Sequence, residues 1–482
     1  MKNIHIIILA GIIFFGFIFR LYRFDNPIAE WHSWRQVDTS SVSRVFVEEG
    51  FDLLHPKYHD LSNVPSGKNN PEGYRFVEFP IYNLLQGGLF KLVGLLSLEE
   101  WGRLITIFSS LSSLLFIYLI LSKHQGRISG LIAAFFFGFL PFSIYYGRVV
   151  LPDTMTAAGV LGGIYFFDLW SSAEKERKSF KKTFPLLILA TSFTALAFLL
   201  KPFAGFFTLP MFYLAFDRFG FKALIKWQLY FFLVLAILPV IGWRLWMLQY
   251  PEGIPWASWL LNLGDIRFKG AFFYWLFADR IGRLILGYWG IVIFAAGFLL
   301  KTKKPLFFYS FVISSLAYFT VIARGNVQHD YYQIMILPTI VIFMGLGGEF
   351  LLSKLRNIGS KFGGIIIFSI STVFCLMFGW YFVRDYFNIN NGAIINAGLE
   401  VDRIIPKDAK IIANYGGDTT LLYQTKRKGW ASLQGELWQM RDMGAGYLLM
   451  VNPTPADFEF AKGYKIVKAT SEYALFDLNS KK

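Results

Sequence analysis

Residues able to do chemistry gather in one short polar stretch near the N-terminus, residues 30–44, EWHSWRQVDTSSVSR. A carboxylate can accept the proton of an attacking hydroxyl, and a guanidinium pairs with carboxylate or phosphate oxygens. Asp38 lies three residues after Arg35, so a helix would present both on one face. We expect the stretch to form one wall of a reaction site, with these candidate residues: Glu30, His32, Trp34, Arg35 and Asp38.

Two further acids are candidates for catalysis. Asp153 follows Pro152 in YYGRVVLPDTMT, and Glu78 precedes a proline in RFVEFPIY. Each has a plainer alternative. Asp153 is equally suited to capping the next helix, and Glu78 is suited to being a solvated charge in a loop or at a helix start.

The composition is that of a polytopic α-helical membrane protein. The chain has 482 residues, of which 55% are hydrophobic and 16% charged, and its mean hydropathy is +0.46. Soluble domains carry about 25% charged residues. Most of the net charge of +15 lies in short loops between apolar runs, as the positive-inside rule predicts, so the charge does not indicate a nucleic-acid partner. A single cysteine excludes a disulfide framework.

The apolar runs predict roughly eleven transmembrane helices. The first follows Lys2 without a small-residue cleavage site, so we interpret it as retained, with the N-terminus in the cytoplasm. A long outer loop, about 21–103, then contains amphipathic helices: one after Asp38 lying on the bilayer surface, and a re-entrant or interfacial one after Glu78. The predicted spans are 4–19, 104–122, 128–146, 154–171, 184–200, 203–217, 227–247, 284–300, 306–323, 332–351 and 363–383.

The composition changes near residue 385. We expect a transmembrane domain over 1–384 and a small α/β domain on the outer side over 385–482. Strands are predicted in IIPKDAKIIANYGG, GYLLMVNPTP and YALFDL, and a helix in DTTLLYQTKRKGW. The domain has no Gly-rich phosphate loop, so we assign it no chemistry.

Several basic residues lie at the outer ends of the predicted spans, where the positive-inside rule does not expect them. An ionisable side chain at mid-span costs about 2.5–3.5 kcal/mol on insertion scales. Snorkelling to headgroups is sufficient for any one of them. As a set they favour an anionic ligand at the outer surface, for which a lipid phosphate is the natural candidate. They are Arg148, Lys201, Arg244, Arg280, Arg283 and Arg324.

The run NVQHDYYQIMILP contains His329, Tyr331 and Tyr332 at the entry to a predicted span. Aromatic residues are expected there as part of a membrane-interface belt, whereas the His–Asp pair is less ordinary. We expect these three side chains to bind substrate. The His and acidic spacings match no strong metal motif, so no metal ligands are assigned, although a divalent metal is left open as a cofactor.

The order of these motifs resembles the membrane glycosyltransferases of the C-type fold, specifically relatives of protein O-mannosyltransferases and of the aminoarabinose transferase that modifies lipid A. The resemblance covers the whole membrane region. It rests on WRQVDTSSVSR in the first outer loop, the Glu78-Phe79-Pro80 turn, Arg148 with Leu151-Pro152-Asp153, Lys201-Pro202, and the run from His329 to Pro338. Relatives usually begin the first-loop helix with an Asp-Glu pair, where this chain has Arg35-Gln36.

The resemblance implies transfer of a sugar from a polyprenyl-phosphate donor to a glycan, lipid or protein acceptor, with inversion, on the periplasmic side of a bacterial inner membrane. Asp38 then takes the base role, although Glu30 or Asp153 are alternatives. We expect Asp38, Asp153, Arg148 and Lys201 to share one hollow. A lipid-linked-sugar flippase or a scaffold protein is the alternative. A flippase is disfavoured because the sequence shows no clear internal repeat.

Overall fold

The computed structural model describes residues 4–299, 302–354 and 362–481. The chain forms two compact units, each of which is built from three separate segments. The helical unit comprises Met1–Phe24, Thr106–Trp243 and Ala257–Asp385, and the mixed unit comprises Asp25–Ile105, Arg244–Trp256 and Tyr386–Lys482. Residues 300 and 301, the basic positions 356 and 361 of a predicted cytoplasmic loop, and residue 482 lie outside the described residues.

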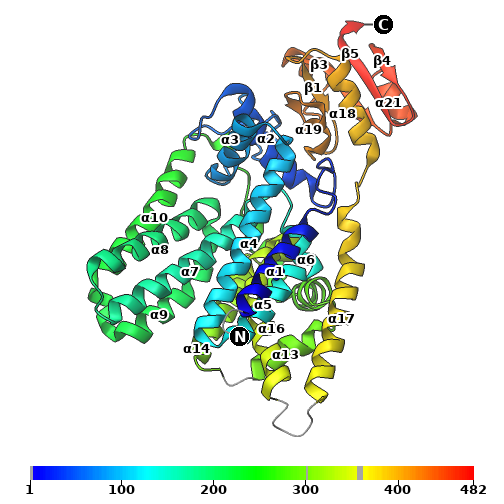
Figure 1. Ribbon diagram of the computed structural model, residues 1–482. Coiled ribbons are helices and arrows are strands. Elements are labelled where there is room, and N and C mark those ends of the chain that lie inside the picture. The colour runs from blue at the N-terminus through cyan, green and yellow to red at the C-terminus, as the bar shows by residue number, and fades with distance from the viewer. Residues whose placement is uncertain (1–3, 300–301, 355–361, 482) are drawn as a thin grey trace. The chain divides into compact units, whose positions relative to one another are not determined.

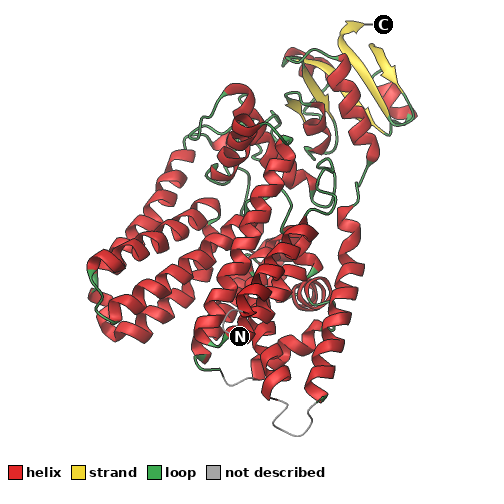
Figure 2. Ribbon diagram, in the orientation of Figure 1, coloured by secondary structure: helices red, strands yellow, loops and turns green. Residues whose placement is uncertain are grey.

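The helical unit consists of helices throughout its described part (Figure 1, Figure 2). Its longer elements are α1 (Ile4–Arg20), α4 (Leu98–His124), α5 (Arg127–Phe139), α7 (Asp153–Lys175), α8 (Phe180–Leu200), α9 (Leu209–Phe219), α10 (Trp227–Met247), η5 (Tyr274–Ile285), α13 (Gly290–Leu299), α14 (Pro305–Val321), α16 (Leu337–Glu349) and α17 (Gly363–Val383). Of these, α4 begins and α10 ends in the mixed unit. The short ones are α6 (Pro141–Tyr146), η1 (Pro202–Thr208), η2 (Gly220–Ile225), α11 (Trp259–Asn262), η4 (Leu263–Phe268), α12 (Gly270–Phe273), α15 (Ala323–Gln328), η6 (Asp330–Met335), η7 (Phe350–Lys354) and η9 (Arg384–Phe387).

A helix occupies each of the eleven predicted runs, but eleven membrane spans are not confirmed. By length and composition, the described helices long and apolar enough to cross a membrane are α4, α8, α10 and the stretch Gly363–Ile404, which begins with α17. A fifth is added if the pair Gly270–Ile285 and Gly290–Leu299, bent by 114°, counts as one span. The predicted span 128–146 is interrupted before Pro141, because proline cannot donate a helical hydrogen bond.

Close helix packing in this unit depends on glycine. A Cβ on Gly347 of α16 would lie 1.8 Å from the carbonyl oxygen of Ile293 in α13, and one on Gly297 of α13 would lie 2.1 Å from that of Phe343. The two backbones therefore approach closely only because both positions lack a side chain, as in other packed apolar helix pairs.

The first two segments of the mixed unit contain α2 (Ser33–Glu49), α3 (Ile81–Val93) and η3 (Pro251–Gly253). The prediction that the helix after Asp38 lies on the bilayer surface is wrong. Most residues of α2 are buried inside the protein, including Val42, Val45 and Phe46. Its serine and threonine side chains allow this, since α3 supplies polar partners. Ser43 donates to Gln86 Oε1 at 2.7 Å.

The interfacial or re-entrant position of α3 stays a prediction, although the helix is too short to be a span. At 13 residues it is shorter than the roughly 20 needed to cross a bilayer. Its buried face is partly polar, with Asn83 and Gln86, whereas Leu85, Leu92 and Val93 are exposed. An apolar outer face of this kind suits a helix lying at a membrane surface.

The C-terminal part of the mixed unit is an α/β fold with a five-stranded sheet in the order β2-β1-β3-β5-β4. β1 (Lys410–Ala413) pairs in parallel with β2 (Gly429–Trp430) and β3 (Ala445–Val451), whereas β5 (Tyr473–Lys481) is antiparallel to β3 and β4 (Tyr464–Ala469). The helices are α18 (Gly392–Ile404), α19 (Thr420–Thr425), α20 (Leu437–Asp442) and α21 (Pro455–Phe460). The strands predicted at β1, β3 and β5 and the helix at α19 are present.

Backbone pairing ties the first outer segment to this sheet. Leu61 N–H donates to the Gly429 carbonyl at 2.7 Å, and Gly429 N–H donates to the His59 carbonyl at 3.0 Å. Leu61 also joins the apolar core that contains Ile412 and Trp430. These contacts explain why segments more than 300 residues apart belong to one unit.

Candidate active site

Asp38 lies on α2 in the mixed unit, and its two carboxylate oxygens have different donors. Arg75 Nη2 donates to Oδ2 at 2.6 Å, and Thr419 Oγ1 donates to Oδ1 at 2.7 Å. The Asp38 side chain is only 7% exposed. A carboxylate has about four acceptor sites, so this arrangement fixes the group in place and leaves lone pairs for a further donor.

Arg35 and Glu78, both predicted to act on substrate, form an ion pair with each other through Nη2 and Oε1. Both side chains are mostly buried, and Arg35 Nη1 also donates to Thr39 Oγ1 at 3.2 Å. The predicted helix does contain Arg35 and Asp38, but each pairs with a residue from the segment 75–78. The pair therefore anchors the Glu-Phe-Pro turn to α2.

The remaining candidates of the first stretch surround the start of α2. Glu30 is fully buried, and Arg103 Nη2 lies 3.5 Å from its Oε1. His32 precedes the helix in the left-handed region at φ 54°. The Trp34 carbonyl accepts a 3.4 Å hydrogen bond from Thr419. Glu30 thus pairs with a cation inside the protein.

Arg244, predicted from its place within an apolar run, also lies in the mixed unit. Its Nη2 donates to the Val77 carbonyl at 3.3 Å, next to Glu78 in the chain. Arg244 and Arg35 therefore contact neighbouring residues of the same segment, Val77 and Glu78.

A second buried acid, Asp60, is a residue that the sequence interpretation missed. It accepts hydrogen bonds from Ser62 and Tyr58 and from the Ala431 backbone N–H. Burial raises the pKa of Asp60 despite these donors. A small cavity with room for about one water molecule is lined by Asp38, Asp60, His59 and Thr419, among others.

In the helical unit, Asp153 and Lys201 form a buried ion pair. Lys201 Nζ lies 2.7 Å from Asp153 Oδ1. Asp153 is the first residue of α7, and Lys201 directly follows α8. The N-cap of α7 is Pro152 and not Asp153, so the capping alternative for Asp153 is wrong. Its other oxygen, Oδ2, is buried and has no hydrogen-bond partner among the described residues.

Aromatic rings frame this ion pair. Lys201 Nζ lies 5.7 Å from the ring centre of Tyr331 and 5.4 Å from that of Tyr332. His329 stacks on Tyr331 with 5.5 Å between ring centres. The adjacent Asp330 is buried and accepts a hydrogen bond from Tyr146. The structure therefore brings four predicted residues of this unit together, namely Asp153, Lys201, Tyr331 and Tyr332, with His329 stacked beside them.

Arg148, in the same unit, is fully buried and donates to the Arg23 carbonyl at 3.0 Å. Arg280 and Arg283, which also lie against the positive-inside rule, both pair with Asp279 at 2.8 and 2.6 Å. These hydrogen bonds and ion pairs thus offset part of the free energy that burying the three guanidinium charges costs.

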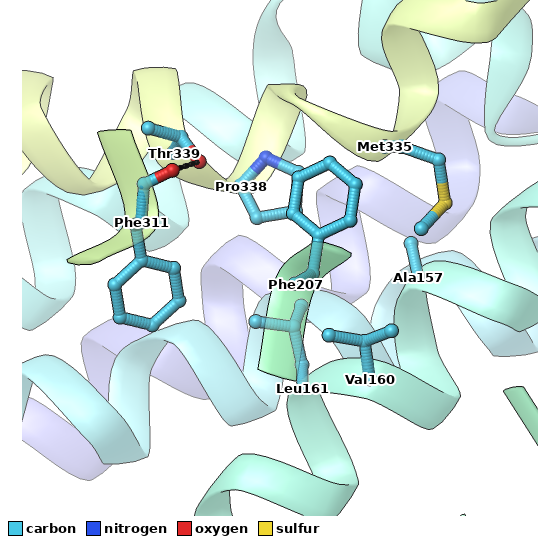
Figure 3. A pocket seen from close by; sticks show the side chains of 8 residues that line it. All are labelled: Ala157, Val160, Leu161, Phe207, Phe311, Met335, Pro338 and Thr339. Atoms are coloured by element: carbon cyan, nitrogen blue, oxygen red, sulfur yellow. Dashed lines mark hydrogen bonds between the residues drawn. The ribbon is translucent and has the colours of Figure 1, made fainter. Parts of the chain in front are cut away.

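The elements that hold Asp153 and Lys201 also form a small apolar cavity (Figure 3). Ala157 lies one turn after Asp153 on α7, and Phe207 belongs to η1, which follows Lys201. Opposite them Thr339 donates to the Phe311 carbonyl at 3.3 Å, which satisfies its hydroxyl. The complete lining is Ala157, Val160, Leu161, Phe207, Phe311, Met335, Pro338 and Thr339.

The predicted residues therefore form two groups, one in each unit. Asp38, Glu78, Arg35, Glu30 and Arg244 belong to the mixed unit. Asp153, Lys201, His329, Tyr331 and Tyr332, called the Asp153 group below, belong to the helical unit. That the two groups converge on one site stays a prediction. Within residues 4–299, 302–354 and 362–481, no group of three or more His, Cys, Asp or Glu side chains is placed to hold a metal ion.

Two partners of Asp38 and one neighbouring acid were not foreseen: Arg75, Thr419 and Asp60. Arg75 precedes the Glu-Phe-Pro turn by three residues, so its position beside the other candidates is the one indication available in the sequence. Asp60 and Thr419 lie in polar loops without a motif. Tertiary contacts bring them near α2: residues 59–61 pair with Gly429, His59 N–H donates to Ser41 Oγ, and Thr420 Oγ1 donates to Ser33 Oγ.

The family model of dolichyl-phosphate-mannose-protein mannosyltransferases matches residues 78–243, about a third of the chain. No curated protein matches at a significant level.

Solved structures match over nearly the whole chain. ArnT from Cupriavidus metallidurans bound to undecaprenyl phosphate aligns with a TM-score of 0.69 at 11% identity, covering 99% of this chain and 98% of that one. The Archaeoglobus fulgidus oligosaccharyltransferase AglB, in complex with an inhibitory peptide and a dolichol-phosphate, aligns with a TM-score of 0.58 at 10% identity, covering 98% and 74%. The chain thus has the fold of these membrane enzymes, as the sequence resemblance predicted.

Proposed function

We propose that this chain is a membrane glycosyltransferase that moves a sugar from a polyprenyl-phosphate donor to an acceptor hydroxyl. Transfer takes place on the periplasmic face of a bacterial inner membrane and inverts the anomeric carbon. The observation that carries the proposal is the fold match along nearly the full chain to ArnT, whose structure contains undecaprenyl phosphate. The AglB structure contains a dolichol-phosphate, a lipid of the same chemical class.

The Asp153 group supplies the chemistry that a donor lipid requires. Lys201 offers an ammonium for phosphate oxygens, and the buried Oδ2 of Asp153 can accept a hydrogen bond from a sugar hydroxyl. A buried carboxylate oxygen without a donor is costly, so a ligand hydroxyl there lowers the free energy of the complex. Tyr331 and Tyr332 give faces on which a sugar ring can stack, and Arg148 adds a second cation in the same unit.

Asp38 is the acid that we assign to the acceptor. The acceptor oxygen forms a bond to the anomeric carbon as the bond from that carbon to the phosphate oxygen breaks. The proton of the acceptor passes to the Asp38 carboxylate, and the phosphate leaves with the electron pair. A placed carboxylate contributes about 10²–10⁴-fold to such a step. Fixed cations stabilise the charge that grows on the leaving phosphate.

The other candidates keep supporting roles. Glu78 and Arg35 hold the Glu-Phe-Pro turn against α2, and Arg244 binds the same turn. We propose that Glu30, His32 and Trp34 fix the conformation of the chain where α2 begins. We also propose that His329 orients Tyr331 by stacking on its ring. No step is assigned to a metal ion, because within the described residues no three His, Cys, Asp or Glu side chains are grouped as a ligand set.

The test is a transfer assay with the purified chain in proteoliposomes. Radiolabelled undecaprenyl-phosphate hexoses serve as donors, a membrane extract supplies acceptors, and release of undecaprenyl phosphate is measured. We expect release that depends on acceptor and on intact Asp38. The anomeric configuration of the product, measured by NMR, tests inversion. Movement of the labelled lipid across the vesicle without release would contradict the proposal in favour of a flippase.

A further inference from the structure

The C-terminal α/β part, to which the sequence assigns no chemistry, reaches Asp38 through the loop after β1. The chain passes from β1 to β2 on one side, then returns to β3 on the other side of β1. The carboxyl end of β1 is therefore the point at which the strand order reverses. In open α/β sheets such points are the usual location of functional loops.

Two glycines shape this loop, which runs from residue 414 to 419. Gly416 and Gly417 have φ of 63° and 89°, values that other residues rarely adopt. The N–H groups of Tyr415 and Gly417 both donate to the Ala431 carbonyl, at 3.0 and 3.1 Å. Asp418 Oδ1 then accepts from the Thr420 N–H at 2.8 Å at the start of α19. The loop backbone is thus held at both ends.

Thr419 is the residue that this loop presents to α2. Its hydroxyl donates to Asp38 Oδ1 at 2.7 Å. Arg75 donates to the other oxygen of the same carboxylate, so the plane of the Asp38 carboxylate is set by two donors from opposite parts of the unit. Arg75 is itself placed by its contact with the Tyr58 ring, 5.1 Å from the ring centre.

A hydrogen bond to a carboxylate stabilises its charged form and fixes its orientation. Losing the Thr419 donor would leave Asp38 with Arg75 alone, so the carboxylate would rotate more freely. A misoriented carboxylate is less able to receive the acceptor proton. The loss acts on the chemical step more than on donor binding.

We propose that Thr419 is a positioning residue for Asp38, so that the C-terminal α/β part completes the acceptor side of the reaction. This inference rests on the proposed function, because it gives Asp38 a role in transfer. Thr419 does not touch the reacting atoms; it acts through the carboxylate it holds.

The experiment compares Thr419→Val, which keeps the shape and removes the donor, with Thr419→Ser, which keeps the donor. Thr470→Val, an exposed turn residue of the same α/β part, is the matched control. Undecaprenyl-phosphate release is measured with varied donor. A hydrogen bond to a charged group is worth roughly 1.5–3 kcal/mol, so we expect Thr419→Val to lower kcat about 10- to 100-fold. Donor KM should stay unchanged, because Thr419 acts on the chemical step through Asp38.

We expect Thr419→Ser to restore most of kcat, and the control to match wild type throughout. Wild-type kcat in Thr419→Val would overturn the inference while leaving the proposed function standing. A lower melting temperature in both Thr419→Val and Thr419→Ala, together with a raised donor KM and no recovery of kcat in Thr419→Ser, would also overturn it, since this pattern indicates a structural role. Absence of transfer by the wild-type chain would overturn the function and the inference together.

Discussion

Lys201 Nζ and Asp153 Oδ1 lie 2.7 Å apart, and their side chains are 10% and 1% exposed. The pair joins the end of α8 to the start of α7, at a place where a lone charge would be costly. Two explanations predict different behaviour. A structural pair is replaceable by neutral residues, whereas a donor-binding pair is not.

Replacing both members separates these explanations. We expect Asp153→Asn alone to lower stability by about 3–5 kcal/mol, because it leaves the buried ammonium without its carboxylate. Adding Lys201→Met should recover most of that stability, since the uncompensated charge is gone. Transfer activity should stay lost in both variants. Melting temperature and undecaprenyl-phosphate release are measured on the same samples, and recovery of transfer in the double variant would show that the pair serves stability only.

Gly417 is expected to resist substitution. Its φ of 89° is strained for a residue with a side chain, and an added Cβ would lie 2.9 Å from Val64 Cγ1. Gly417→Ala should therefore cost about 1–3 kcal/mol and reduce transfer by displacing Thr419. Gly463→Ala is the matched control, because its Cβ would meet no atom within 4 Å. Equal melting temperatures for the two variants would contradict this account of the loop.

His59 should make stability depend on pH. Burial lowers its pKa below the usual value of about 6.5, although the 2.9 Å hydrogen bond between His59 Nε2 and the accepting carboxylate of Glu48 opposes the shift. An unfolded chain takes up a proton at this histidine as pH falls through about 6.5, whereas the folded chain does so only at lower pH. Stability is therefore fully present above that value and is lost as pH decreases.

The measurement is the melting temperature of wild type and His59→Gln between pH 5.5 and 7.5. We expect the wild-type value to fall toward pH 5.5 and the variant to fall less steeply. Burial opposes the effect of His59 and Arg44 on the pKa of Glu48, but the net shift is downward. Glu48 therefore takes up a proton only below the pH range measured. Parallel slopes would rule out His59 as the source.

The sequence predicted most of the framework and one part of the site. Apolar runs were sufficient to locate the helices, because their length and composition are local properties, and β1, β3 and β5 followed from local strand patterns. The number of membrane spans was not confirmed, since several of these helices are short, broken or bent. The surface position expected for α2 was wrong, because its burial depends on polar partners from α3 that no periodicity reveals.

Candidate acids were easier to find than their partners. Asp153 and Lys201 were both selected from their positions beside predicted spans, and the structure pairs them. Arg75 and Thr419, which hold Asp38, were not selected. Thr419 is separated from Asp38 by 381 residues, and it is brought near by tertiary contacts such as the pairing of residues 59–61 with Gly429 and the hydrogen bond from Thr420 Oγ1 to Ser33 Oγ. Contacts of this kind depend on tertiary structure and leave no local pattern.

Asp38→Asn tests the central claim most directly. The substitution keeps the size of the side chain and removes the negative charge that receives the acceptor proton. Asp52→Asn, at an acid of the same unit whose side chain is 60% exposed, is the control. With melting temperatures matched to wild type, we expect kcat for undecaprenyl-phosphate release to fall about 10²–10⁴-fold in Asp38→Asn and to stay at the wild-type value in the control. Wild-type turnover in a correctly folded Asp38→Asn protein would contradict the account.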